Sequence, residues 1–262
     1  MEALLSKETS CNSPLSVCGR TDKGAVRSHN EDYFGYFIPS DAHVMDKFGS
    51  LFVVSDGVGG NAAGEVASAE AVSVLLQEYY FGEHTEKAPE RLKNTFRQTA
   101  MHIYDLSSSH HSVNNMRCTL TTLLLKGNRF YIAHVGDSKV YLIRDNKILQ
   151  LTKDHSLVGK LLRLGLISKE DARTHPNKNI LLRAVGEGPI LPPDFYSGYV
   201  LAGDIFCLVT DGITEHFTED ELRLFLEEKG YNDNGLDQLV AEINRRGGYD
   251  NMTILTVKAE EV

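Results

Sequence analysis

The stretch CTLTTLLLKGNRFYIAHVGDSKVYLIRDNKILQLT, residues 118–152, decides the fold. It holds four apolar runs rich in β-branched and aromatic residues, and turn signals such as Gly127-Asn128 and Asp145-Asn146 separate them. Runs of this kind predict consecutive antiparallel strands. No helical segment joins one run to the next, so this part of the chain does not follow the strict βαβ alternation of a parallel sheet.

Helical patterns stand in pairs around this block. Residues 64–80 carry apolar side chains at helical spacing, and a second helical stretch runs from Pro89 to about Leu106. Residues 156–175 indicate short helices with loops. The other expected elements are strands at 51–56, 195–201, 204–211 and 252–257, and helices at about 218–228 and 235–246.

Consecutive strands with paired helices predict an α+β fold. We expect a central antiparallel β-sandwich flanked by pairs of α-helices, in four layers ordered α-β-β-α. Since no linker-like stretch interrupts the chain, residues 15–262 are expected to form a single domain after a short N-terminal extension at residues 1–14.

Composition and charge limit the possible partners. The 262 residues carry a formal net charge of −9, which argues against a nucleic-acid partner because such partners need basic patches. Four cysteines form no CxxC pair, and Cys118 and Cys207 stand inside apolar runs, where a reduced, buried thiol is expected. This favours a reducing compartment. The first residues lack the pattern of a signal peptide, and no window approaches the roughly 20 apolar residues of a membrane span. We therefore expect a cytoplasmic monomer that binds neither nucleic acid nor membrane.

Three aspartates share one setting, at the mouth of an apolar strand. Asp56 and Asp211 each end such a run and are followed by glycine, and Asp250 stands just before MTILTV. A carboxylate in this setting lies half in the core, where its charge is costly. Any one of them alone is more often a turn residue, but three in one chain favour a shared function.

If the three aspartates converge, protonation or cations between them must relieve their repulsion. Oxygen ligands without convergent Cys or His select Mg²⁺ or Mn²⁺ over Zn²⁺. Two such ions about 3.5–4 Å apart are a common means of attacking phosphate esters. The aspartates therefore predict Mn²⁺ or Mg²⁺ as the cofactor.

Two further segments carry side chains suited to phosphate chemistry. RSHNED (27–32) offers Arg27, a natural bidentate clamp for a phosphate, with Glu31 close by. AHVGDSKVY (133–141) places Asp137 directly after an apolar strand. Taken alone, the first is more simply a solvated loop and the second a β-turn.

Six segments in this order resemble the metal-dependent protein phosphatases, the type 2C serine/threonine phosphatase family, in their bacterial form. They span nearly the whole chain from about residue 16, and the family fold agrees with the sandwich expected above. The segments are RSHNED (27–32), VVSDGVGG (53–60), HVGDSKVY (134–141), LTKDHS (151–156), LVTDGITE (208–215) and GGYDNMTILTV (247–257).

The resemblance implies a metal-binding role for five of the matched residues. Asp56 would bridge two catalytic metals, and the Gly57 carbonyl would bind one of them. Asp211 and Asp250 would hold the other metal of the pair. Asp137, with Asp211, would bind a third ion.

The resemblance also implies how the substrate is handled. Arg27 would bind the substrate phosphate, while Glu31 and Asp32 would orient metal-bound waters. Residues from about 156 to 186 match the flap beside the active site.

The implied reaction is hydrolysis of phosphoserine and phosphothreonine monoesters on proteins by a hydroxide that bridges the metals. Phosphorylated proteins are the expected substrates, and a bacterial Ser/Thr kinase is the expected opposing enzyme. No Cys-x5-Arg loop surrounds any of the cysteines, so no covalent phosphoenzyme is expected.

Three positions depart from the family pattern. Val58 stands where animal members often carry a histidine proposed as general acid, and where bacterial members usually have methionine. Lys139 replaces the usual arginine, and Arg117-Cys118-Thr119 replaces the usual Gly-Thr-Thr. None of these changes removes an expected metal ligand.

Two other classes of protein are weighed against a phosphatase. A catalytically weak phosphoprotein-binding module would be expected to lose metal ligands, yet all four candidate aspartates are present. Residues 57–62 fit the dinucleotide-binding pattern GxGxxA, and Glu78 follows about 20 residues on. Asp56 would, however, set a negative charge against the pyrophosphate of the dinucleotide.

Overall fold

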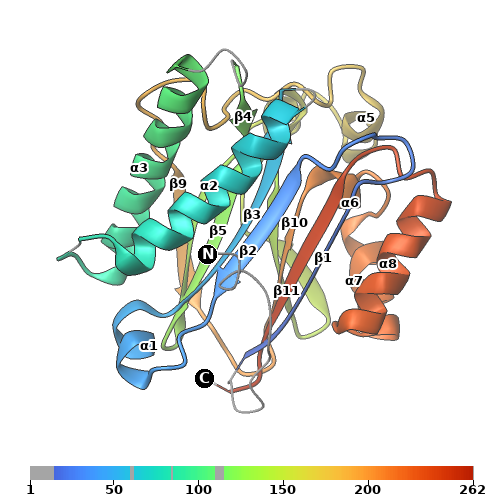
Figure 1. Ribbon diagram of the computed structural model, residues 1–262. Helices are drawn as coiled ribbons and strands as arrows, with labels where there is room; N and C mark the ends of the chain where they lie inside the picture. The colour runs from blue at the N-terminus through green and yellow to red at the C-terminus, as the bar shows by residue number, and fades with distance from the viewer. Residues whose placement is uncertain (1–14, 60–61, 84, 110–114, 262) are drawn as a thin grey trace.

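The computed structural model describes residues 15–59, 62–83, 85–109 and 115–261. The extension predicted at residues 1–14 lies outside these ranges. Two antiparallel sheets stack face to face, and helices cover both outer faces (Figure 1). The α+β sandwich flanked by helices that the sequence predicts is confirmed.

All pairings between the strands named here are antiparallel. One sheet has the strand order β1-β11-β10-β7-β8; the other has the order β2-β3-β5-β6-β9, with the short β4 paired to β3. The strands are β1 Leu15–Asp22, β2 Asp32–Phe37, β3 Ser50–Val58, β4 Arg117–Cys118, β5 Leu120–Lys126, β6 Arg129–Val135, β7 Lys139–Arg144, β8 Lys147–Gln150, β9 Asp194–Tyr199, β10 Ile205–Val209 and β11 Met252–Ala259.

This topology contradicts the dinucleotide-binding alternative. That fold needs a parallel sheet with crossover helices, whereas β3, the strand before residues 57–62, pairs antiparallel with both of its sheet neighbours. Residues 60–61 of the motif lie outside the described ranges.

Two pairs of helices form the outer layers. The helices α2 and α3 lie on the β2-β3-β5-β6-β9 sheet, and α7 and α8 lie on the other sheet (Figure 1). In the part of the chain that is described, no helix has the length and apolarity needed to cross a membrane. The helices are α1 Ala42–Phe48, α2 Ala62–Phe81, α3 Ala88–Ser109, α4 Leu157–Arg163, α5 Lys169–Thr174, α6 Asp211–Thr214, α7 Glu219–Lys229 and α8 Asp233–Arg245.

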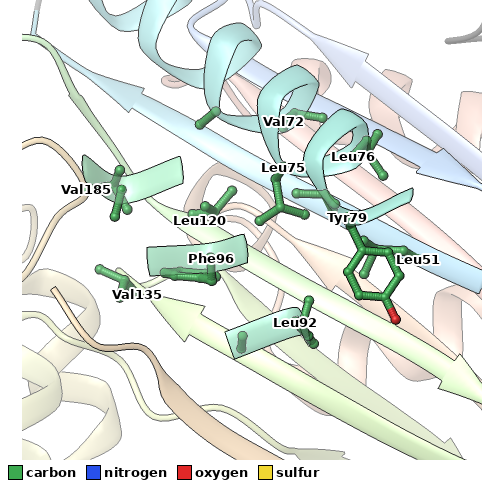
Figure 2. Packing of buried hydrophobic residues seen from close by; sticks show 14 of the residues in the cluster. Leu51, Val72, Leu75, Leu76, Tyr79, Leu92, Phe96, Leu120, Val135 and Val185 are labelled. Atoms are coloured by element: carbon green, nitrogen blue, oxygen red, sulfur yellow. The ribbon is translucent and has the colours of Figure 1, made fainter. Parts of the chain in front are cut away.

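Three apolar clusters fill the spaces between these four layers. Figure 2 shows the one under α2 and α3, where Leu51 of β3 lies with Leu75 and Phe96 of the helices. The next residue of β3, Phe52, belongs instead to the cluster between the two sheets. Successive side chains of a strand point to opposite faces. Because both faces of β3 are buried, its residues 51–54 form a continuous apolar run rather than alternating with polar residues.

The sequence does not predict β1, β2 or α1. β1 is an edge strand with a single partner, β11, and its side chains are mostly half-buried or exposed. It therefore mixes polar and apolar residues and lacks the continuous apolar run that marks β3 or β10.

The topology brings several strand ends to one edge of the sandwich. Val209 at the end of β10 pairs with Ile254 near the start of β11, so the residues beyond these ends meet. Asp32 at the start of β2 lies opposite Asp56 on β3. The ends of β2, β10 and β11, which are far apart in the sequence, thus lie close together at this edge.

The cluster between the sheets generates a stability prediction. Leu123 of β5 is fully buried there, so Leu123→Ala should lower the free energy of unfolding by about 3 kcal/mol through lost burial and a cavity. For a chain of this size, this is roughly a 6–12 °C fall in Tm. Leu149→Ala is the matched control, because Leu149 is 59% exposed, and its Tm should stay near that of the wild type. A fall below about 1 kcal/mol for Leu123→Ala would contradict this packing.

Candidate metal centre

A cavity of about 310 Å³ lies at this edge of the sandwich. Every residue predicted from the sequence to bind metal or phosphate lines it, and Glu31 does too, while Asp32 is buried beside Asp56. The flap contributes Asn179 and Leu181 to the same wall. The predicted lining residues are Arg27, Glu31, Asp56, Gly57, Asp137, Asp211 and Asp250.

Thr119 holds Asp56 in place. The Asp56 amide donates to the Thr119 hydroxyl at 2.8 Å, and the Thr119 amide donates to the Asp56 carbonyl at 2.8 Å. The Thr119 hydroxyl also lies 2.7 Å from that of Ser138, which follows Asp137. The departure at Arg117-Cys118-Thr119 therefore keeps the threonine that ties the first aspartate to the region of the second.

Gly57 lies where the chain has no room for a side chain. A Cβ at this position would collide with the Gly64 carbonyl of α2 and would come within 2.7 Å of the Glu31 carbonyl. The Gly57 amide donates to that Glu31 carbonyl at 3.0 Å. Glycine thus lets the RSHNED loop and α2 close around the residue next to Asp56.

Asp211 is the first residue of α6, directly after the end of β10. Thr210 before it donates its hydroxyl to Asp32 Oδ2 at 2.7 Å and accepts from the Thr253 amide at 2.9 Å. These contacts join β10, β11 and β2 at the point where the carboxylates gather.

Asp250 and the RSHNED loop are joined by Asn251, a residue that the sequence analysis does not single out. The Asn251 side chain donates to the His29 carbonyl at 2.8 Å and accepts from the Glu31 amide at 2.8 Å. Arg27 Nη2 then lies 2.6 Å from Asp250 Oδ2. The only sequence signal for Asn251 is its position between Asp250 and an apolar strand.

Asp137 follows Gly136, whose φ of +116° suits a residue without a side chain. Lys139 reaches back to the Asp137 carbonyl at 3.2 Å and forms an ion pair with Asp154 at 3.2 Å. The lysine that replaces the usual arginine therefore still forms an ion pair. His155 accepts from the Gly136 amide at 3.1 Å through Nδ1, which fixes the same turn from the flap side.

The carboxylates shift one another's protonation. The pKa of Asp56 lies well above its usual range because the group is buried and because Asp32 and Asp211 are close. The pKa of Asp211 is likewise raised, by burial first and then by Asp137 and Asp250. Without cations, this cluster holds its full negative charge only at a considerable cost in free energy.

Two further carboxylates follow the same trend. Burial raises the pKa of Asp32 to about 7, although its hydrogen bond from Thr210 acts in the opposite direction. Burial raises the pKa of Asp137 to about 6, against the lowering effect of Lys139. Among the described residues, Asp32 Oδ1 is buried with no hydrogen-bond partner. A buried carboxylate oxygen without a partner indicates an additional group, such as an ordered water, at this position.

The donors are carboxylate and carbonyl oxygens, which fit hard divalent cations such as Mg²⁺ and Mn²⁺. Within the described ranges, no three His, Cys, Asp or Glu side chains already converge closely enough to hold an ion. Asp250, one of the predicted ligands, is engaged by Arg27 at 2.6 Å.

Comparisons with known proteins agree on one family. The family described as Protein phosphatase 2C matches residues 20–158. The serine/threonine phosphatase stp of Listeria monocytogenes is 37% identical over 246 residues, which cover 92% of this chain and 94% of that protein.

Solved structures extend the likeness to the whole fold. The serine/threonine phosphatase Stp1 of Staphylococcus aureus superposes with a TM-score of 0.85 at 28% identity, covering 98% of this chain and 99% of its own. The catalytic domain of the phosphatase PstP, solved in complex with two manganese ions, has a TM-score of 0.78 at 28% identity and covers 93% of this chain and 97% of its own.

The crowded carboxylates generate a prediction about stability with and without metal. Asp211→Asn removes one of several buried like charges, so the metal-free variant should melt a few degrees higher than the wild type, by roughly 1 kcal/mol or more. Saturating Mn²⁺, at about 100 times its Kd, should stabilise the wild type by about 2.7 kcal/mol, and the variant by much less. Thermal melts with and without Mn²⁺ measure both effects.

Asp237→Asn serves as the control for this prediction, because Asp237 is a surface aspartate paired with Arg20. It should leave the Mn²⁺-induced shift in Tm unchanged. If Asp211→Asn melted lower than the wild type without metal and kept the full Mn²⁺ shift, Asp211 would not be part of the charge cluster that the cation relieves.

Proposed function

The chain belongs to the protein phosphatase 2C family and is a metal-dependent serine/threonine protein phosphatase of the bacterial type, and on this basis we propose which residues carry the reaction. Asp56 and the Gly57 carbonyl would hold one divalent cation, and Asp56, Asp211 and Asp250 would hold the second. Asp137, with Asp211, would hold a third. When bound, such cations lower the pKa of water and neutralise charge on the phosphoryl oxygens.

One observation carries this proposal. Four aspartates from four separate segments line a single cavity of about 310 Å³, and burial together with neighbouring carboxylates raises the pKa of those at its centre. Perturbed pKa values that gather in one cavity are typical of functional sites. Mn²⁺ and Mg²⁺ are the cations that this oxygen-rich set would select.

Arg27 is placed to bind the substrate phosphate. Its guanidinium contacts Asp250 at 2.6 Å, yet its side chain is half exposed, so it can reach both the carboxylates and an incoming phosphate. A guanidinium offers two parallel N–H donors to a phosphate. A phosphate bound by Arg27 would lie beside the aspartates of the cavity.

Asp32 and Glu31 would orient the attacking water. Asp32 Oδ1, which is buried without a hydrogen-bond partner, would accept one hydrogen of that water. In the reaction, the water gives up one proton to solvent and its oxygen attacks phosphorus. The bond from phosphorus to the serine or threonine oxygen breaks, and the leaving oxygen gains a proton from solvent. Val58 cannot supply that proton.

A covalent intermediate on cysteine finds no support in the described thiols. Cys18, Cys118 and Cys207 are free and buried, and burial raises the pKa of Cys118 and of Cys207 to about 12. Thiols of this kind are not nucleophiles at neutral pH. Three free thiols also suit the reducing cytoplasm expected from the sequence.

Phosphorylated serine and threonine residues of proteins are the substrates that the family activity implies. We propose a cytoplasmic serine/threonine kinase as the enzyme that this phosphatase opposes. The kinase is identified by its product alone, a phosphate monoester on a protein hydroxyl.

The first test is activity with Mn²⁺. The purified chain should hydrolyse an aryl phosphate and a phosphothreonine peptide only when Mn²⁺ or Mg²⁺ is present. Asp250→Asn should lower kcat by at least about 100-fold, since it removes a charge that offsets the cations in the transition state. Asp237→Asn, the same chemical change at the surface, should retain activity. Near-normal turnover by Asp250→Asn under saturating Mn²⁺ would show that Asp250 is not a ligand.

Arg27→Ala tests the phosphate clamp separately. A charged hydrogen bond contributes about 1.5–3 kcal/mol, so KM should rise roughly 10- to 100-fold while kcat changes little. The KM of Arg27→Lys should lie between those of the wild type and Arg27→Ala, because lysine keeps the charge and loses the bidentate geometry. Steady-state kinetics with a phosphothreonine peptide decides the matter. A loss confined to kcat would mean that Arg27 acts only in the transition state.

A further inference from the structure

Two exposed apolar side chains flank the proposed phosphate clamp. Tyr249 precedes Asp250 and is 61% exposed, and Val26 precedes Arg27 and is 65% exposed. The clamp itself joins Arg27 to Asp250 at 2.6 Å. Apolar surface therefore lies one residue away on both chain segments that meet at the mouth of the catalytic cavity.

The Tyr249 ring is held in place from behind. It stacks on the His216 ring with centroids 5.4 Å apart and an angle of 23° between the planes. His216 is buried, donates from Nδ1 to the Gly212 carbonyl at 3.0 Å, and has its own carbonyl bound by Arg246 at 2.8 Å. A ring so supported loses little conformational freedom when a ligand contacts it.

Gly247, two residues before Tyr249, leaves room for the tyrosine ring. A Cβ on Gly247 would lie 2.5 Å from Tyr249 Cζ, and the φ of Gly247 is +128°. Glycine at this position therefore allows both the turn and the position of the ring. The Tyr249 ring therefore has a defined position, fixed by its contacts with His216 and by the space that Gly247 leaves.

Val26 belongs to the same junction. The amides of Ala25 and Val26 donate to the Gly248 carbonyl at 2.9 Å and 3.3 Å. The backbone on either side of the Arg27–Asp250 contact is thus tied together, and Val26 and Tyr249 are fixed relative to the clamp.

We propose that Val26 and Tyr249 form an apolar rim that binds an apolar side chain next to the phosphorylated serine or threonine of the substrate. The inference rests on the proposed function, because Arg27 must hold the phosphate for the neighbouring substrate residue to reach this rim. Consecutive Cα atoms are 3.8 Å apart. When Arg27 holds the phosphate, the substrate residues next to the phosphorylated one therefore lie close to the clamp. Val26 and Tyr249 are adjacent in the chain to the two residues of that clamp.

The rim lies next to the catalytic cavity, so a side chain of the protein substrate is the group expected to bind there. A protein substrate must pass over the cavity mouth, and the exposed fractions of Tyr249 and Val26 are surface that it can cover. Contact of an aromatic ring with another ring or an aliphatic side chain, beyond simple burial, contributes enough to change kcat/KM by about 2- to 10-fold.

The experiment compares two phosphothreonine peptides that differ only beside the phosphothreonine, with phenylalanine on both sides in one and alanine in the other. The wild type with Mn²⁺ should show a kcat/KM ratio of about 5 in favour of the phenylalanine peptide. Tyr249→Ala should reduce this ratio to about 1, and Tyr249→Phe should keep it. A ratio is the appropriate measure, because any disturbance of Asp250 lowers the rates for both peptides together.

Tyr199→Ala is the matched control, since Tyr199 is also about 60% exposed but lies on β9 and, unlike Tyr249, is not adjacent in the chain to a residue that lines the cavity. It should leave the ratio as in the wild type. A wild-type ratio near 1, or a ratio that Tyr249→Ala leaves unchanged, overturns the rim. Failure of the wild type to hydrolyse either peptide with Mn²⁺ would instead overturn the proposed function.

Discussion

Several negatively charged carboxylates are held close together at one partly buried edge of this protein. The surrounding structure keeps them there despite their mutual repulsion. Asp56 and Asp211 have raised pKa values because they are buried and because other aspartates of the cluster are close, and the pKa of Asp137 is raised mainly by burial. Isolated, such a cluster would spread apart or take up protons. Two stacked sheets prevent the spreading, because each aspartate is fixed at or just beyond the end of a strand that is buried in the sandwich. Protonation or bound cations would relieve the remaining repulsion, and cations would also supply the chemistry.

Neutral side chains, in addition to the charged Arg27 and Lys139, hold the cluster in position. Thr119 ties Asp56 to the turn that carries Asp137, Thr210 ties β10 to β2 and β11, and Asn251 ties the Arg27 loop to Asp250. Each uses both donor and acceptor capacity. Positioning of this kind adds no charge, so it leaves the carboxylates free to respond to cations and substrate. A centre held by rigid elements with a hydrogen-bonded second layer is the arrangement expected of a preorganised site.

The aspartates could be predicted from the sequence because each stands at the mouth of an apolar run, where a charge is out of place. The sandwich could be predicted because strands such as β3, buried on both faces, contain continuous apolar runs. The edge strand β1 lacked that signal, since only part of it is covered. Thr119 and Asn251 were beyond prediction from the residues, because a threonine or asparagine in a loop is ordinary until its partners, distant in sequence, are known. The same holds for Tyr249, whose support by His216 is a tertiary contact.

We infer that bound cations would take the place of Arg27 as the partner of Asp250. Anomalous diffraction at the manganese edge, on crystals of the intact chain grown with Mn²⁺, tests it most directly. We expect two manganese peaks, one on each side of Asp56. We also expect the Asp250 carboxylate to have left Arg27 and to contact one of the two ions. Manganese found only at surface carboxylates, with Asp56 free of metal and the 2.6 Å contact between Arg27 and Asp250 intact, would contradict the account.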